Sequence, residues 1–138
     1  MQKREAKETI NMQKYEIITD QNDENYGHIR ALIDFRNVKK GDVGGKIDNY
    51  DNLSQEGDCW VVYNARVCDD SKVYGNARVH DHAEVYGNAE VCGNAYVRED
   101  AKVYDEATVY GNALVSGKAE VSGNARVYDT AYVYEDAR

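Results

Sequence analysis

Apolar residues recur with a period of six over the second half of the chain. From Ala65 to Asp136 the sequence divides into 12 hexads without an insertion, and valine holds the third place of every hexad. Alanine holds the first place in all but one, where Ser71 stands. The residue between them is mostly polar, which is the period-2 alternation of a β-strand with one buried face. The pattern predicts a short strand in each hexad and inward core positions at Val67, Val73, Val79, Val85, Val91, Val97, Val103, Val109, Val115, Val121, Val127 and Val133.

The residues after each valine predict how the chain runs between strands. Many are Gly-Asn pairs or acidic residues, and Gly and Asn turn a chain because they accept positive φ. An α-helix is excluded, since a period of six would place successive valines about 240° apart around its axis. A corner after every strand closes most simply as a triangle of three hexads, so one coil takes 18 residues. A short fixed period of this kind is typical of a solenoid.

The remainder of the chain precedes these repeats. Residues 1–13 are polar and charged without an apolar stripe, which predicts a flexible tail. Residues 14–40 contain two strand-like runs around a polar loop, and we interpret this β-hairpin as an N-terminal cap that closes the core. The β-helix then covers residues 41–138 and is regular from residue 65. Its first coil is irregular, because Asn49 and Gln55 stand where the period expects valine.

The motif Val-x-Gly-Asn-Ala-x resembles the hexapeptide repeat of the left-handed parallel β-helix family, which is best known from bacterial acyltransferases. The resemblance covers over half of the chain, and the segment 35–61 is similar to an uncharacterised branch of that family in bacteria and their phages. One departure is that Tyr commonly follows the valine here and Gly comes next. The expected fold is all-β, a triangular parallel β-helix with an N-terminal β-hairpin cap, and the resemblance implies that it is left-handed.

Residues 18 apart should stack in columns on the outside of the three faces. The first and second faces carry charges of both signs, which sets the register of the coils and keeps those faces in water. The third column is mostly large and apolar, and such a patch on a flat face marks an interface. We expect self-association there, with a ligand, a foreign partner or an ordinary surface as alternatives. This predicted interface consists of Trp60, Arg78, Tyr96, Leu114 and Tyr132.

The last residues, Ala137 and Arg138, begin a further hexad. A solenoid end exposes unpaired strand groups, which favour pairing with another chain. We therefore expect a second copy to cover this end. The C-terminal end and the apolar third face together predict a homo-oligomer, either a dimer or a trimer. Tyrosines that follow valine should also stack at the corners, among them Tyr86 on Tyr104 and Tyr110 on Tyr128.

Composition narrows the classes of function. The net charge of -8 argues against direct nucleic-acid binding, which normally uses a basic face, but it leaves open an acidic decoy that occupies a nucleic-acid-binding protein. The sequence has no long apolar run and no signal peptide, so we expect a cytoplasmic protein that does not bind membranes. Three cysteines, Cys59, Cys68 and Cys92, show neither a disulfide framework nor zinc-ligand spacing. No metal site is predicted.

The family resemblance also implies a catalytic alternative. Hexapeptide acyltransferases use an acyl thioester donor such as acyl-CoA and a histidine as general base. The candidates are His80 and His82, and Asp100 lies one coil after His82, where it could orient the ring. The competing interpretation is that both histidines are surface residues at corners. We expect a non-catalytic scaffold or interaction protein of bacterial or phage origin without a cofactor, with the acyltransferase and the acidic decoy as alternatives.

Overall fold

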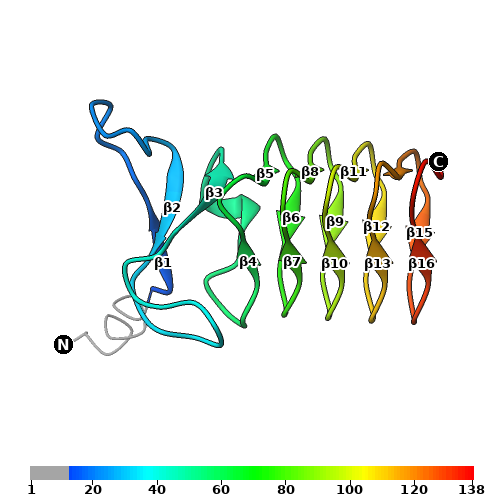
Figure 1. Ribbon diagram of the computed structural model, residues 1–138, viewed down its shortest axis with the longest axis horizontal. Helices are drawn as coiled ribbons and strands as arrows, with labels where there is room; N and C mark the ends of the chain where they lie inside the picture. The colour runs from blue at the N-terminus through cyan, green and yellow to red at the C-terminus, as the bar shows by residue number, and fades with distance from the viewer. Residues whose placement is uncertain (1–12) are drawn as a thin grey trace.

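A computed structural model describes residues 13–138 and shows an all-β chain folded as a parallel β-solenoid of about five turns, which confirms the predicted fold class (Figure 1). The predicted tail, residues 1–13, lies outside the described residues apart from Gln13. The left hand of the coil stays a prediction. Within residues 13–138 no helix is long and apolar enough to cross a membrane.

Each hexad contributes one two-residue strand, and strands 18 residues apart pair in parallel to form the three faces. The first face contains β3 (Val43–Ile47), β5 (Arg66–Val67), β8 (Glu84–Val85), β11 (Lys102–Val103) and β14 (Glu120–Val121). The second face contains β6 (Lys72–Val73), β9 (Glu90–Val91), β12 (Thr108–Val109) and β15 (Arg126–Val127). The third face contains β4 (Trp60–Val61), β7 (Arg78–Val79), β10 (Tyr96–Val97), β13 (Leu114–Val115) and β16 (Tyr132–Val133).

The core is a narrow column of valine side chains. The inward valines from Val67 to Val127 are buried, and Val133 in the last coil is half-buried and packs against them. Alanines beside the corners are also buried as far as Ala119. Short strands on three sides therefore bury an apolar interior that one coil could not enclose alone.

The N-terminal hairpin extends the first face. Strand β1 (Tyr15–Ile17) pairs antiparallel with β2 (His28–Ala31), which in turn pairs antiparallel with β3. Strand β3 then pairs in parallel with β5 of the first regular coil. Gly44 and Gly45 in β3 pack so closely that a side chain at either would collide with backbone carbonyls of Val61 or Ala65. The hairpin thus joins the solenoid by continuous backbone hydrogen bonding.

The first coil differs in register from the pattern of the regular hexads. Ile47 pairs with Val67 and Leu53 with Val73, so these two residues continue the inward columns. The positions of Asn49 and Gln55 are therefore not inward valine places, which corrects the sequence-based register. Asn49 is instead the N-cap of the short 3-10 helix η1 (Tyr50–Asn52). Gln55 accepts hydrogen bonds through Oε1 from the backbone N–H groups of Lys14 and Tyr15.

The corners are joined from coil to coil by side chains. As expected, the rings of Tyr86 and Tyr104 stack at 5.0 Å, and those of Tyr110 and Tyr128 at 5.4 Å. An amide ladder runs along another edge, where Asn76 donates to Asn94 and Asn94 donates to Asn112. On the first face the opposite charges share the predicted register, but within residues 13–138 they form no ion pair. Hydrogen bonds and stacking, not salt bridges, connect the exposed side chains of successive coils.

Candidate functional site

The outward column of the third face is divided into a covered part and an exposed part. Trp60 and Arg78 are each only 4% exposed, because the segment 35–38 folds back over them. Phe35 packs edge-on against the Trp60 ring at 5.4 Å. Farther along the column Tyr96 is 38% exposed and Tyr132 is 57% exposed. The apolar patch open to solvent is therefore shorter than the sequence suggested, and it begins at Tyr96.

Two adjacent cavities lie where this segment meets the third face. The first is about 270 Å³ and the second about 240 Å³ in volume. Both are lined by Asn37, Arg78 and His80. Trp60 and Tyr63 contribute to the first cavity, and Arg36 and Tyr96 contribute to the second. The predicted interface residue Arg78 and the predicted base His80 thus come together beside a segment that the hexad pattern did not connect with them.

The polar atoms at this place are incompletely hydrogen-bonded. Arg78 donates through Nη1 to the Asn37 side-chain oxygen at 3.1 Å. Its Nε and Nη2 atoms are buried and have no partner among residues 13–138, and the same holds for His80 Nε2 and Arg98 Nε. Buried donors are normally satisfied, so the three such atoms of Arg78 and His80, two residues that line both cavities, indicate an unusual polar environment. The described structure offers no carboxylate within salt-bridge distance of Arg78.

Burial and positive charge shift the pKa values of two of these groups. Desolvation lowers the pKa of His80, and the neighbouring charges of Arg78 and Arg98 lower it further, while Asp81 acts in the opposite sense. Desolvation also lowers the pKa of Arg78, with a contribution from Arg36. The His80 ring stacks on Tyr96 with centroids 5.3 Å apart. His80 is therefore held as a neutral ring in a fixed orientation at neutral pH.

The other proposed catalytic residues lie away from these cavities. His82 and Asp100 are exposed at a corner, where their backbone N–H groups donate to the carbonyls of Glu99 and Gly117. No side-chain hydrogen bond between His82 and Asp100 occurs within residues 13–138. The low pKa of His80 makes it a weak base, and its Nε2 atom is shielded from solvent. The catalytic role of these three residues stays a prediction.

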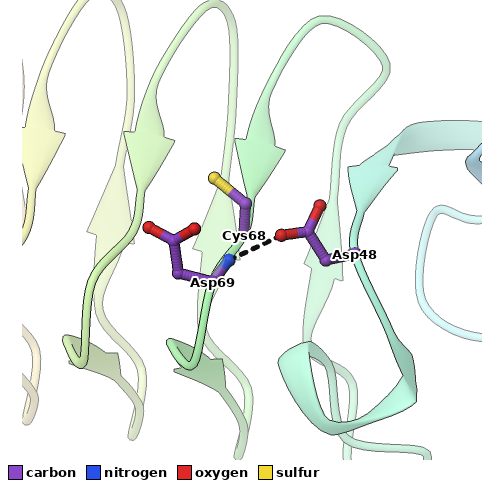
Figure 2. Close-up of side chains that lie close together, drawn as sticks. All are labelled: Asp48, Cys68 and Asp69. Atoms are coloured by element: carbon purple, nitrogen blue, oxygen red, sulfur yellow. Dashed lines mark hydrogen bonds between the residues drawn. The ribbon is translucent and has the colours of Figure 1, made fainter.

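A second cluster, formed by Asp48, Cys68 and Asp69, was not predicted from the sequence. Their side-chain oxygen and sulfur atoms lie within 4.8 Å of one another (Figure 2). Asp48 accepts the backbone N–H of Asp69 at 2.7 Å, and Asp69 accepts that of Gly87 at 3.0 Å. Burial and both carboxylates raise the pKa of the Cys68 thiol. We assign this cluster a structural role, because its hydrogen bonds join successive coils. The sequence alone did not predict it, because Asp48 reaches Asp69 only in the observed register of the first coil.

A buried lysine anchors the hairpin to the first coil. Lys14 Nζ donates to the carbonyls of Gly57 at 3.1 Å and Cys59 at 2.8 Å, and it lies 3.4 Å from the Cys59 sulfur. Desolvation lowers the pKa of Lys14 and raises that of Cys59. The ammonium also lies over the Phe35 ring. This contact holds the hairpin and the segment 35–38 in place, and nothing in the local sequence distinguishes Lys14 from the other lysines.

Comparison with known proteins adds no family to this description. No protein-family model matches the chain, and no curated protein matches it. The structure shows a parallel β-solenoid with stacked coils of about 18 residues, and these comparisons support neither membership of the hexapeptide-repeat family nor a relation to acyltransferases.

Proposed function

We propose that the protein is a non-catalytic scaffold that self-associates through the exposed part of its third face. The observation that carries this proposal is a contrast between faces. Beyond Arg78 the outward strand positions of the third face are occupied by the exposed Tyr96 and Tyr132 and the half-buried Leu114, whereas the corresponding positions of the other two faces are mostly charged. An apolar, flat stripe of this kind is typical of a protein interface.

The backbone gives this face a fixed shape. The backbone of each strand forms N–H to carbonyl hydrogen bonds with strands one coil away. Corner residues add further hydrogen bonds between coils. The interior is filled by valine and alanine without exposed surface over most of its length. A face that is already ordered loses little conformational entropy when it associates. This rigidity supports a role in assembly.

A second copy of the chain would meet the least charge repulsion on the third face. The net charge of -8 makes two copies repel each other over most approaches. From β10 onward the outward strand positions of the third face carry no charge, so joining two such faces removes the fewest charged groups from water. The segment 35–38 already packs against the covered part of the same face, which supports the view that this surface accepts an apolar cover.

The mass of the protein in solution tests the proposal. We expect light scattering to give a multiple of 15.6 kDa for the wild-type chain and 15.6 kDa for the Leu114→Glu, Tyr132→Glu variant. Two glutamates there would be buried against each other in the complex, which is strongly unfavourable. Thr108→Glu with Asn124→Glu adds the same charge elsewhere and should leave the oligomer intact. A monomeric wild type, or equal dissociation of both variants, would contradict the proposal.

A further inference from the structure

The side chain of Arg78 is the least satisfied charged group in the described part of the chain. It is 4% exposed, and only Nη1 has a partner, the side-chain oxygen of Asn37. The two donors that remain, Nε and Nη2, form one edge of the guanidinium. Burying a charge without a counterion is costly, and so is burying a donor without an acceptor. The structure therefore places an unpaired positive charge under the segment 35–38.

Another arginine of the same chain shows what this edge of the group binds. Arg30 directs its Nε and Nη2 atoms at Glu16 Oε2, at 3.0 and 2.7 Å. An arginine edge of two parallel donors matches the oxygens of a carboxylate or a phosphate. Arg78 presents the same two atoms, and within residues 13–138 no acidic side chain meets them. The chemistry of the edge thus specifies an oxyanion.

Among residues 13–138, the second cavity is lined by cationic side chains and by no acidic residue. Arg36 lines it together with Arg78, and the charge of Arg36 contributes to the lowered pKa of Arg78, whereas Asp58 acts in the opposite sense and Asp42 lines the first cavity. Arg98 lies one coil beyond His80 and has an unpartnered, buried Nε atom. Such a concentration of cationic donors stands out in a protein with a net charge of -8. A positive site of this kind attracts anions although the molecule as a whole repels them.

We propose that Arg78 and His80 form a binding site for the oxyanion group of a small ligand, a carboxylate or a phosphate. The Nε and Nη2 atoms of Arg78 bind two ligand oxygens, and His80 Nε2 donates a further hydrogen bond when it carries the proton. Trp60 and Tyr63 line the larger cavity, so a nonpolar part of the ligand packs there. The donors are shielded from solvent, and the ligand enters when the exposed side chains of Arg36 and Asn37 move aside.

Arginine side-chain NMR on the full chain tests this site directly. The probes are inorganic phosphate and acetate, each titrated at constant ionic strength against chloride. We expect a saturable shift of the Arg78 Nε resonance with at least one probe, and no saturable shift for the exposed Arg66 and Arg126. A response to phosphate alone identifies a phosphorylated ligand, and a response to acetate alone identifies a carboxylate. An Arg78 resonance that neither probe shifts would overturn the proposal and leave water as the partner of these donors.

Thermal unfolding supplies a second measurement. The probe that shifts Arg78 should raise the Tm of the wild type and of Arg66→Met, and it should leave the Tm of Arg78→Met unchanged, because a ligand stabilises only the chain that binds it. Equal stabilisation of all three chains would show a nonspecific anion effect and contradict the site. If Arg78→Met does not fold, the NMR titration of the wild type decides the question.

Discussion

Three arginines show how the environment sets the role of a single residue type. Arg66 is exposed on the first face, where it shares the register of Glu84. Arg30 is half-buried in the hairpin and holds Glu16 in a close ion pair. Arg78 occupies the place in its hexad that Arg66 occupies in another, yet it is buried without a carboxylate. The hexad motif determines that each of Arg66 and Arg78 points outward from its strand. The segment 35–38 determines that Arg78 is buried and hydrogen-bonded to Asn37.

At the residue scale, we predict that His80 makes stability depend on pH. Because the pKa of His80 is lowered in the folded protein, the unfolded chain binds more protons once the pH falls below about 6.5. The contribution of the neutral ring is complete above that pH and is lost as the pH falls toward the folded pKa. The groups that act on the ring are Arg78, Arg98 and Asp81, with Tyr96 stacked on it.

Melting curves between about pH 7.5 and 5.5 check this prediction. The Tm of the wild type should fall more steeply on acidification than that of His80→Gln. The matched control is His82→Gln, because His82 belongs to the same hexad but is exposed. This control should retain the wild-type profile. Identical profiles for His80→Gln and the wild type would show that the ring titrates as in the unfolded chain.

At the scale of single elements, the corner turns decide where each strand ends. Glycines occupy the left-handed region at several corners, for example Gly87 at φ 68°. At equivalent corners an acidic residue adopts the same conformation, as Asp105 does at φ 59°. A non-glycine residue there is strained, and the carboxylate compensates by accepting a hydrogen bond from the next coil. For Asp105 the donor is the Gly123 N–H at 3.0 Å.

We predict a graded response to substitution of Asp105. Asp105→Asn keeps both the turn conformation and an acceptor oxygen, so its stability should match the wild type. Asp105→Gly keeps the conformation but loses the bond, which should cost about 0.5–1.5 kcal/mol. Asp105→Ala loses the hydrogen bond and also disfavours the left-handed conformation, so it should lower the unfolding free energy by about 1–2 kcal/mol more than the glycine variant does. Urea unfolding measures the three values, and an alanine variant as stable as the asparagine variant would refute this account of the corners.

At the scale of the whole molecule, the coil of 18 residues is the unit of assembly. Removing residues 101–118 joins Asp100 to Ala119, so the hexads continue and every later residue stays on its original face. We predict that this chain folds cooperatively, with a smaller dependence of its unfolding free energy on urea because less surface is exposed on unfolding. Removing residues 101–109 breaks the period and should abolish cooperative unfolding of the coils that follow. Equal behaviour of the two deletions would mean that the period does not define the fold.

The sequence by itself determined the regular part of the molecule. The Ala-x-Val hexads predicted parallel strands, inward valines and columns of outward residues, and the strand pairing follows that spacing from β5 onward. These features are predictable because each coil meets a neighbour of the same pattern, so one short rule describes every contact. The tyrosine stacks follow from the same rule.

Only the tertiary structure decided what happens where the period fails. The register of Ile47 and Leu53, and the anchoring of Lys14, depend on residues far away in the sequence. Arg78 is bonded to Asn37, which lies 41 residues earlier in a segment without repeats. The segment 35–38 covers two of the five residues of the predicted interface column, Trp60 and Arg78, and forms the cavities beside His80. A local pattern cannot predict such a site, because its geometry is set by how an irregular segment packs on a surface, which no spacing in the chain encodes.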